Sequence, residues 1–148
     1  MAQIKLRSPS ADEVPVMRHL YKEMYETIGS SEPPAEWVIN VHQQSLSGER
    51  SYWFALLDNE IIGFVDFKVM LFHPGSDQKF ARIFDLFIRQ SMHRRGYGTQ
   101  LASKTINSAI EQGASNIELN VLPNNDIALA FWRSLGFNLH LYVLQMSV

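Results

Sequence analysis

The stretch "RQSMHRRGYGTQLASKTI", Arg89–Ile106, joins a basic cluster to two glycines and then to a helix-like pattern. A helix N-terminus presents unpaired backbone N–H groups and a partial positive charge, which together bind anions such as phosphate. Gly96 and Gly98 let the backbone bend and approach a ligand without Cβ interference, and Arg94 and Arg95 add charge. The stretch predicts an anion site, although a plain turn with solvated arginines fits the same short glycine pattern.

Composition favours a small anionic molecule, and not nucleic acid or a membrane, as the ligand of this site. The chain has 148 residues, 46% hydrophobic and 19% charged, which is ordinary for one soluble domain spanning residues 1–148. The formal net charge of −2 gives no bulk attraction to nucleic acid or to a membrane. The basic residues also form no extended stripe, so we expect no nucleic-acid partner.

Several other classes of chemistry are excluded by the residue types. The chain has no cysteine, which removes disulfides, thiolate metal sites and cysteine nucleophiles. The five histidines show no metal-ligand spacing, so we expect no metal. The first residues, "MAQIKLRSPSADEV", lack the apolar core of a signal peptide, and no run approaches membrane-spanning length. We therefore expect a cytoplasmic protein with no membrane partner.

The first third of the chain predicts one short strand and two helices. Residues 4–6 read as a strand, and a helix beginning near Asp12 keeps Pro15 in its first turn, where the missing N–H costs little. An apolar stripe recurs every four residues from Val16 to Ile28. A second helix follows "SEPP" and ends at Gly48.

From Ser51 the pattern changes to strands. "SYWFALL" and "IIGFVDFKVML" are rich in aromatic and β-branched residues, and "DNE" between them is typical of a hairpin turn. A loop, "FHPGSDQK", leads to "FARIFDLFI", which is apolar on both faces apart from Arg82 and Asp85, as expected for a central strand.

The last third alternates helices and strands. After the glycine turn we expect a helix ending at Gly113, a strand at "NIELNVL", a helix in "PNNDIALAFWRSLGF" and a last strand at "NLHLYVLQM". A right-handed crossover within residues 80–122 would make its two strands parallel neighbours. The prediction is an α/β sheet with helices on its faces.

These motifs, in this order, resemble the GNAT superfamily of N-acetyltransferases. "HRRGYG", preceded by "IFDLFIRQSM", resembles the family's acetyl-CoA-binding motif, while "EIIGFVDF" and "NNDIALAFWRSLGF" are similar to its third strand and to a later helix. The resemblance implies a single-domain fold, with a mixed, mostly antiparallel sheet of six or seven strands and about four helices. It also implies acetyl-CoA as cosubstrate.

The resemblance carries over to particular positions. Backbone N–H groups of residues 93–99 would hold the pyrophosphate of CoA, and its pantetheine arm would lie along the end of the central strand like an added strand. A later helix would contact the cofactor from the other side, and Tyr97 would cover it. The cofactor-binding residues expected are Leu86, Phe87, Ile88, His93, Arg94, Arg95, Gly96, Tyr97, Gly98, Thr99, Asn125, Ala128 and Phe131.

Two departures from the family pattern affect the expected chemistry. His93 stands where Arg or Gln is usual, and Trp132 stands where many members have a tyrosine proposed to protonate the leaving thiolate. An indole N–H is far too weak an acid for that role. Tyr142 on the last strand is a possible substitute acid; water is another source of the proton, and Tyr142 could equally serve packing alone.

Asp85 is the candidate general base, or the residue that orders a relay water. It is the only acid in the apolar central strand, next to the position expected for the thioester. The alternative is a structural ion pair with Arg82 or another buried cation. Many relatives carry a glutamate one residue earlier, where this chain has Phe84.

Three functions remain open from the sequence. The first is acetyl transfer to the primary amine of a small molecule or polypeptide, by direct attack in a ternary complex. The others are a catalytically silent acyl-CoA sensor and a nucleotide-phosphate binder unrelated to CoA. We expect the acceptor between the first two helices, residues 72–79 and the last strand, with Glu26, Glu32 and Asp66 attracting an ammonium group. Edge pairing of the last strand into a homodimer is also possible.

Overall fold

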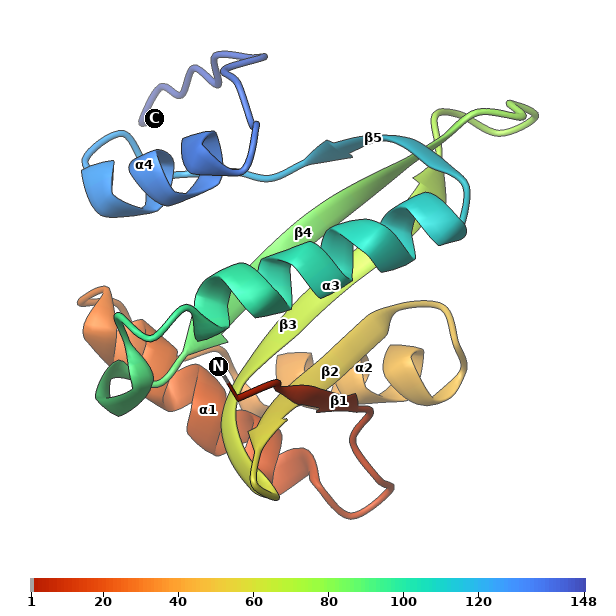
Figure 1. Ribbon diagram of the computed structural model, residues 1–148. Helices are drawn as coiled ribbons and strands as arrows, with labels where there is room; N and C mark the ends of the chain where they lie inside the picture. The colour runs from red at the N-terminus through yellow and green to blue at the C-terminus, as the bar shows by residue number, and fades with distance from the viewer. Residues whose placement is uncertain (1) are drawn as a thin grey trace.

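A five-stranded mixed sheet organises the protein, whose computed structural model describes residues 2–148. The strands lie in the order β1-β2-β3-β4-β5 (Figure 1). Every junction is antiparallel except the parallel pairing of β4 with β5. Their bounds are β1 Lys5–Arg7, β2 Ser51–Leu57, β3 Glu60–Leu71, β4 Lys79–Ile88 and β5 Ala114–Glu118.

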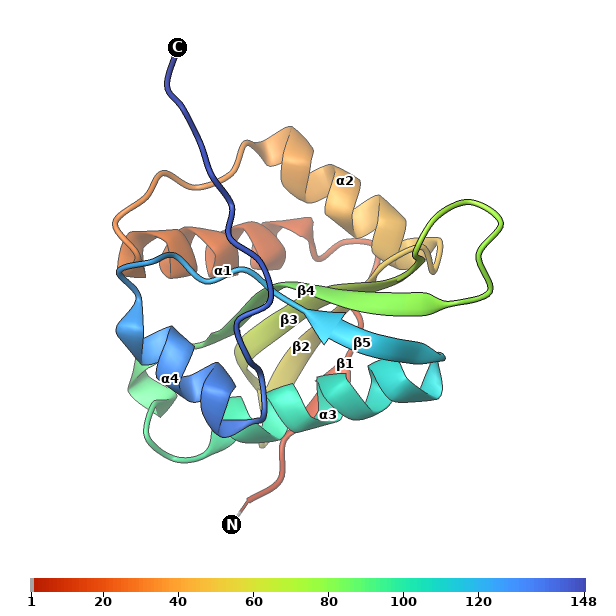
Figure 2. The ribbon, with the colours of Figure 1, turned by 90° about the horizontal axis from the view of Figure 1, so that it is seen from above.

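Helices cover both faces of this sheet. Figure 2 shows α1 and α2 on one side, and α3 and α4 on the other. The sheet is therefore buried on both faces, with one apolar cluster under each helical layer. The helices are α1 Val14–Thr27, α2 Ala35–Leu46, α3 Tyr97–Glu111 and α4 Asp126–Ser134, with a 3₁₀ turn η1 at Gln90–Met92. The expected α/β class and crossover are confirmed.

Local sequence signals explain where the early elements begin and turn. Pro15 lies in the first turn of α1, as its missing N–H requires. The β2–β3 hairpin turns at Asp58 and Asn59, whose φ angles of 51° and 68° are both left-handed. That pair of angles is the signature of a type I′ turn, whose twist matches that of the flanking strands. Asp and Asn tolerate this region better than other non-glycine residues.

Strands β3 and β4 approach each other closely at Gly63. Its partner across the sheet is Ile88, and a Cβ at this position would lie 2.1 Å from the Phe87 carbonyl oxygen. Behind them, the Phe64 ring stacks on Tyr52 at 5.1 Å between centroids and tilts against Phe87 at 6.1 Å. Only glycine fits between β3 and β4 without moving the end of β4.

The strand count differs from the prediction of six or seven, because the expected last strand does not form. Residues 138–148 follow α4 as an extended segment without strand pairing. The alternating pattern in "NLHLYVLQM" sets an extended conformation, but a strand also needs a partner for its backbone groups. Tyr142 lies in this segment with 83% of its surface exposed.

We expect Gly63→Ala to lower the free energy of unfolding by about 2 kcal/mol or more, since the new methyl group displaces β4. Urea unfolding followed by circular dichroism measures the change. Gly98→Ala is the control, because its Cβ would meet Phe131 at an ordinary 3.7 Å. Equal stability of the two variants would contradict the close approach at Gly63.

Candidate functional site

The sheet opens on one side of β4 beyond Arg82. Parallel pairing with β5 ends where Arg82 faces Glu118, and the two side chains form an ion pair there. Strand β4 continues to Ile88, paired with β3 alone (Figure 1). The edge of residues 83–88 that faces away from β3 therefore has no strand partner within residues 2–148. This open edge is the segment predicted to receive the extended arm of a ligand.

The turn after β4 presents a row of free amides at the start of α3. Arg94 and Gly96 have left-handed φ angles of 63° and 81°, which bend the chain into the helix. The first helical bond runs from the Gln100 N–H to the Gly96 carbonyl, 3.1 Å away, and no side chain caps the helix. In the described part of the chain, the N–H groups of residues 94–99 have no acceptor. This row lies where the sequence predicts an anion site.

Three elements meet at Gly98. A Cβ there would lie 3.7 Å from the Phe131 ring of α4 and 4.0 Å from the Ile88 side chain of β4. The structure thus brings the end of β4, the start of α3 and the inner face of α4 together, as the sequence predicted for these three groups of residues. Asn125 begins α4, and its Oδ1 accepts a hydrogen bond from the Ala128 N–H at 3.1 Å.

His93 ties the turn to the end of β4. Its Nε2 donates a hydrogen bond to the Ile88 carbonyl oxygen at 2.6 Å, so that carbonyl is directed away from β3. The Arg89 N–H, one residue on, bonds back to Ile62 in β3. Because the N–H and C=O of one residue point the same way in an antiparallel strand, the Ile88 N–H faces the open edge. That N–H is available as a donor to a ligand.

Two aromatic side chains have packing roles. The Tyr97 side chain is only 8% exposed and lies in the core under α3, so it does not cover the site as expected; its backbone N–H remains in the free row. Trp132 is 9% exposed and packs edge-on against Phe131 and Phe137. Its indole therefore presents an apolar surface at the position where the family resemblance leads one to expect a tyrosine.

Asp85 is held at the open edge of β4 next to a bulge. Asp66 and Phe67 in β3 face Asp85 and Ile83, which leaves Phe84 as the extra residue. Bulges of this kind re-aim side chains beside functional sites. Within the described chain the Asp85 carboxyl has no hydrogen bond or ion pair, and Arg82 pairs with Glu118 instead. The structural ion pair with Arg82 considered from the sequence is thus absent.

The pKa of Asp85 is raised to about 7, mainly by burial and in addition by the negative charge of Asp66, while the positive charge of Arg50 opposes both. A carboxyl normally loses its proton near 3.8. Asp85 is therefore able both to take and to release a proton near neutral pH, as general acid–base catalysis requires.

A buried ion pair that the sequence analysis missed lies next to Asp85, on the neighbouring strand β3. Arg50 donates from Nε and Nη2 to the two carboxylate oxygens of Asp66, at 2.5 and 2.7 Å. Asp66 has no exposed surface, so it is not an open acid for an ammonium group as expected. The Arg50 guanidinium also lies 4.1 Å from the centre of the Phe84 ring. The signal in the sequence was Asp66, the lone acid in "FVDF". The structure pairs it with Asp85 in the sheet register.

Tyrosines line the α1–α2 side of these carboxyls. Tyr21 donates a long hydrogen bond of 3.4 Å to Asp66. The Tyr52 hydroxyl is buried with no partner among the described residues. Burial raises the pKa of Tyr21, Tyr25 and Tyr52, and the charge of Asp85 adds to the effect in each case. All three hydroxyls therefore remain protonated donors at neutral pH.

The remaining expected site residues lie in three separate parts of the chain. Arg94, Arg95 and Thr99 are exposed beside the row of amides. Glu26 and Glu32 are exposed on and after α1. No described residue is linked to the Tyr142 side chain by a hydrogen bond, and most of its surface is exposed.

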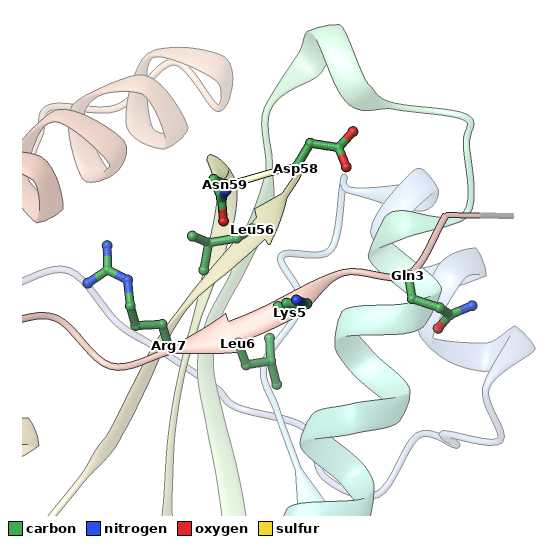
Figure 3. A pocket seen from close by; sticks show the side chains of 7 residues that line it. All are labelled: Gln3, Lys5, Leu6, Arg7, Leu56, Asp58 and Asn59. Carbon is green, nitrogen blue, oxygen red and sulfur yellow. The ribbon is translucent and has the colours of Figure 1, made fainter.

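A hollow of about 540 Å³ lies elsewhere, beside β1 and the β2–β3 turn, and carries no converging chemistry. Figure 3 shows that the polar ends of Gln3, Arg7 and Asp58 point in different directions. We place the functional site at the open edge of β4, where the groups converge. Within residues 2–148, no three His, Asp or Glu side chains could jointly hold a metal ion, and no helix is long and apolar enough to cross a membrane.

Comparison with known proteins identifies the class. Residues 14–137 match the model of the acetyltransferase (GNAT) family. A transcriptional regulator from Bacillus halodurans C-125 has the same fold, with a TM-score of 0.81 and 19% identity over 99% of this chain and 100% of that one. The solved structure of aminoglycoside N-acetyltransferase AAC(6′)-Iy in complex with CoA has a TM-score of 0.79 and 18% identity, covering 100% of this chain and 96% of that one.

A third solved structure is an aminoglycoside acetyltransferase, meta-AAC0020, from an uncultured soil metagenomic sample, in complex with sisomicin. Its TM-score is 0.75, with 23% identity over 98% of this chain and 95% of that one. At these identities the solved structures establish the fold, and the family model establishes membership. The chain belongs to the acetyltransferase (GNAT) family. Within that class, the protein is an N-acetyltransferase.

We expect Asp85→Asn to stabilise the fold at pH 8 but not at pH 4. The folded pKa, about 7, lies above the ordinary 3.8, so the folded chain binds more protons between these values. Stability of the native protein then falls as pH rises through this window. The variant avoids that loss, by up to about 4 kcal/mol.

Chemical unfolding from pH 4 to pH 8 measures the difference. Asp77→Asn, in the exposed loop before β4, is the matched control. A constant difference between Asp85→Asn and the native protein across this range would show that Asp85 titrates as an ordinary surface carboxyl.

Proposed function

We propose that this protein transfers the acetyl group of acetyl-CoA to the primary amine of a small molecule, by direct attack in a ternary complex. One observation carries the proposal: the open edge of β4 leads directly into the free amides of residues 94–99 and also carries the unpaired carboxyl of Asp85. A titrating carboxyl, an unpaired strand edge and a row of free amides thus follow one another along the chain from Asp85 to Thr99. Residues 1–148 act as one domain in this proposal.

The residues at the turn fit CoA. The pyrophosphate would accept hydrogen bonds from the amides of residues 94–99, with Arg94 and Arg95 adding charge and Thr99 a hydroxyl. His93, already bonded to Ile88, would act by shaping the turn. The pantetheine amides would bond to the open edge of Leu86, Phe87 and Ile88 as an added strand does. Asn125, Ala128 and Phe131 would bound the other side.

Asp85 would act as the base. A free alkylammonium has a pKa near ~10.4 and must lose its proton before it attacks. A carboxyl with a pKa of about 7 accepts that proton more readily than an ordinary aspartate, directly or through one water. The Ile88 N–H, aimed at the open edge, would donate to the carbonyl oxygen as negative charge develops there.

Protonation of the departing thiolate needs no strong acid. A thiol has a pKa near ~8.5, so the thiolate is a tolerable leaving group, and water can supply the proton. Trp132 cannot act as the acid because it is buried and not acidic. Tyr142 would serve only if the segment that carries it were brought to a site, and in its own chain it is exposed.

The acceptor would bind on the α1–α2 side, where tyrosine hydroxyls surround the carboxyls. Aminoglycosides are one candidate acceptor class, because related folds have been solved with sisomicin and with a CoA–acetylneamine bisubstrate analogue. The acids Glu26 and Glu32 would attract such polycations over a distance. We place the enzyme in the cytoplasm and expect it to act as a homodimer.

Gly96→Glu is expected to weaken CoA binding about 100-fold or more, since it puts a negative side chain among the phosphate-binding amides and strains a left-handed position. Isothermal titration with CoA measures the loss. Gly48→Glu makes the same change at a similar φ of 78°, at the end of α2, and should bind CoA normally. Unchanged affinity in Gly96→Glu would rule out this anion site.

Asp85→Asn should lower kcat by about 100-fold or more while changing the Kd of CoA less than about twofold. In the native enzyme, kcat/KM should rise with pH through about 7, as Asp85 loses its proton. The variant should lose that limb of the profile. Free-thiol release across a panel of amines is the assay.

Full activity in Asp85→Asn would remove this residue from the mechanism. Tight CoA binding by the native chain without turnover on any amine would favour the acyl-CoA sensor instead. Preference for ATP or NAD over CoA in competition would favour the nucleotide-phosphate binder.

A further inference from the structure

Arg50, directly before β2, contacts two neighbours of Asp85 without bonding to Asp85 itself. Its guanidinium donates two hydrogen bonds to Asp66, at 2.5 and 2.7 Å, and lies 4.1 Å from the centre of the Phe84 ring. Asp66 is the register partner of Asp85 on β3, and Phe84 is the bulge residue directly before Asp85 on β4. One cation thus holds residues on two sides of the candidate base.

The Arg50 side chain is itself held from several directions. It is only 11% exposed, and its Nη1 donates a hydrogen bond of 3.4 Å to the Gln44 side chain. The Arg50 backbone N–H bonds to the Gln44 carbonyl oxygen at 3.2 Å, in the last turn of α2. A guanidinium presents its donors in a rigid fork that fits the two oxygens of a carboxylate. The position of Arg50 is therefore set by α2, β3 and β4 together.

Asp66 and Asp85 differ in their hydrogen bonds although they are register partners. Asp66 accepts both bonds from Arg50 and a longer one, of 3.4 Å, from the Tyr21 hydroxyl. Within residues 2–148, the half-buried Asp85 carboxyl has no hydrogen bond or ion pair. Hydrogen bonds to a carboxylate favour its charged form, so protonation of Asp66 would weaken them. Asp85 can accept a proton without losing a bond.

We propose that Arg50 and Asp66 are positioning residues for Asp85: their ion pair occupies one carboxylate and holds Phe84, which leaves the other carboxyl as the free proton acceptor at the open edge of β4. The inference rests on the proposed function, in which Asp85 is the base. Neither positioning residue is proposed to touch the acetyl group or the amine, because both act through Asp85.

A purely structural ion pair is the alternative. Burying two charges costs desolvation free energy that their attraction often only balances, so such a pair contributes little to stability by itself. The contacts of Arg50 with Asp66 and Phe84 both lie next to Asp85, at the register shift between β3 and β4. That arrangement favours a role in placing Asp85.

The other titratable groups around Asp85 carry no charge at neutral pH. They are tyrosines from α1 and β2, and burial raises the pKa of each. These tyrosines are Tyr21, Tyr25 and Tyr52. The buried His42 of α2 donates to the Ser10 carbonyl oxygen at 2.8 Å instead.

The remaining cations on β3 and β4 have partners of their own. Lys68 pairs with Glu49 at 3.7 Å, and Arg82 pairs with Glu118. Asp66 and Arg50 are the charges that shift the pKa of Asp85, in opposite directions. A change at either residue should therefore alter the titration of Asp85, which a purely structural pair would leave in place.

Asp66→Asn tests the proposal through the pH dependence of kcat/KM. The amide removes the negative charge and keeps an oxygen that can accept from Arg50. The limb expected near pH 7 should move to lower pH by about one unit or more, because Asp85 loses a neighbouring like charge and keeps the nearby cation.

Arg50→Met should move the same limb to higher pH by about one unit or more, since the cation that favours the charged carboxyl is lost. Arg50→Lys keeps the charge and should restore most of the native profile. Arg50→Met also leaves Asp66 buried without its partner, so circular dichroism must first show that this variant is folded. Asp66→Asn decides the question if it is not.

Arg7→Met is the matched control. Arg7 donates to both carboxylate oxygens of Glu13, at 2.6 and 3.1 Å, and lies 5.3 Å from the centre of the Phe54 ring. It thus makes the same two kinds of contact on β1, at the far edge of the sheet from Asp85. Its loss should leave the pH midpoint unchanged.

Direct titration separates failure of this inference from failure of the proposed function. Carbon-13 NMR of the aspartate carboxyl groups follows Asp85 in the full chain without ligand, with Asp85→Asn assigning the resonance. A midpoint that moves as expected supports the positioning role even where no amine is acetylated, and the proposed function alone then fails. An unchanged Asp85 midpoint in folded Asp66→Asn overturns the inference, whatever the activity. A fall in kcat at every pH with an unmoved midpoint overturns it as well.

Discussion

The backbone of β4 sets the constraint on which the site depends. A strand inside a sheet normally satisfies its N–H and C=O groups on both sides. Here the β5 partner ends at Glu118, while β4 runs on to Ile88 with β3 alone. Hydrogen-bonding capacity therefore remains on one edge, next to the helix that starts at Tyr97. A ligand that is itself extended and polar meets that need, whereas a compact apolar ligand does not.

The same constraint explains the local sequence around β4. Gly63 allows β3 to hold the end of β4 in place from the paired side. His93 occupies the Ile88 carbonyl on the open side, which leaves the N–H of that residue as the free donor. The bulge at Phe84 shifts the register of β4 next to Asp85. Each of these features therefore sets the position or the free hydrogen-bonding groups of the β4 backbone.

The electrostatics of the site depend on two carboxyl groups and one cation. Asp66 and Asp85 face each other in the register of β3 with β4, and Arg50 is the cation that lowers the pKa of both. Arg50 makes both of its short bonds to Asp66, which oppose the rise that burial causes in the pKa of that carboxyl. Two nearby carboxylates do not both ionise readily in a partly buried site. Asp85 has no such bonds, so burial and the charge of Asp66 raise its pKa to about 7, opposed by Arg50 through charge alone.

The sequence predicts features that depend on neighbouring residues better than features that depend on contacts between residues far apart in the chain. The hairpin turn at Asp58 and the placing of Pro15 in the first turn of α1 are set by a few neighbouring residues, and the sequence predicts both, although not the type I′ geometry. The crossover and the glycine turn follow from the order of elements. Arg50 was missed because its partner lies in another strand, and the burial of Asp66 depends on that long-range pair.

The C-terminal segment separates two kinds of sequence information. Its alternating apolar pattern specifies an extended conformation, which the structure has. The pattern does not specify which edge completes the strand, because any open edge offers the same backbone groups. In this fold the segment has no strand partner within residues 2–148, so the pattern specifies its conformation without deciding whether a strand forms.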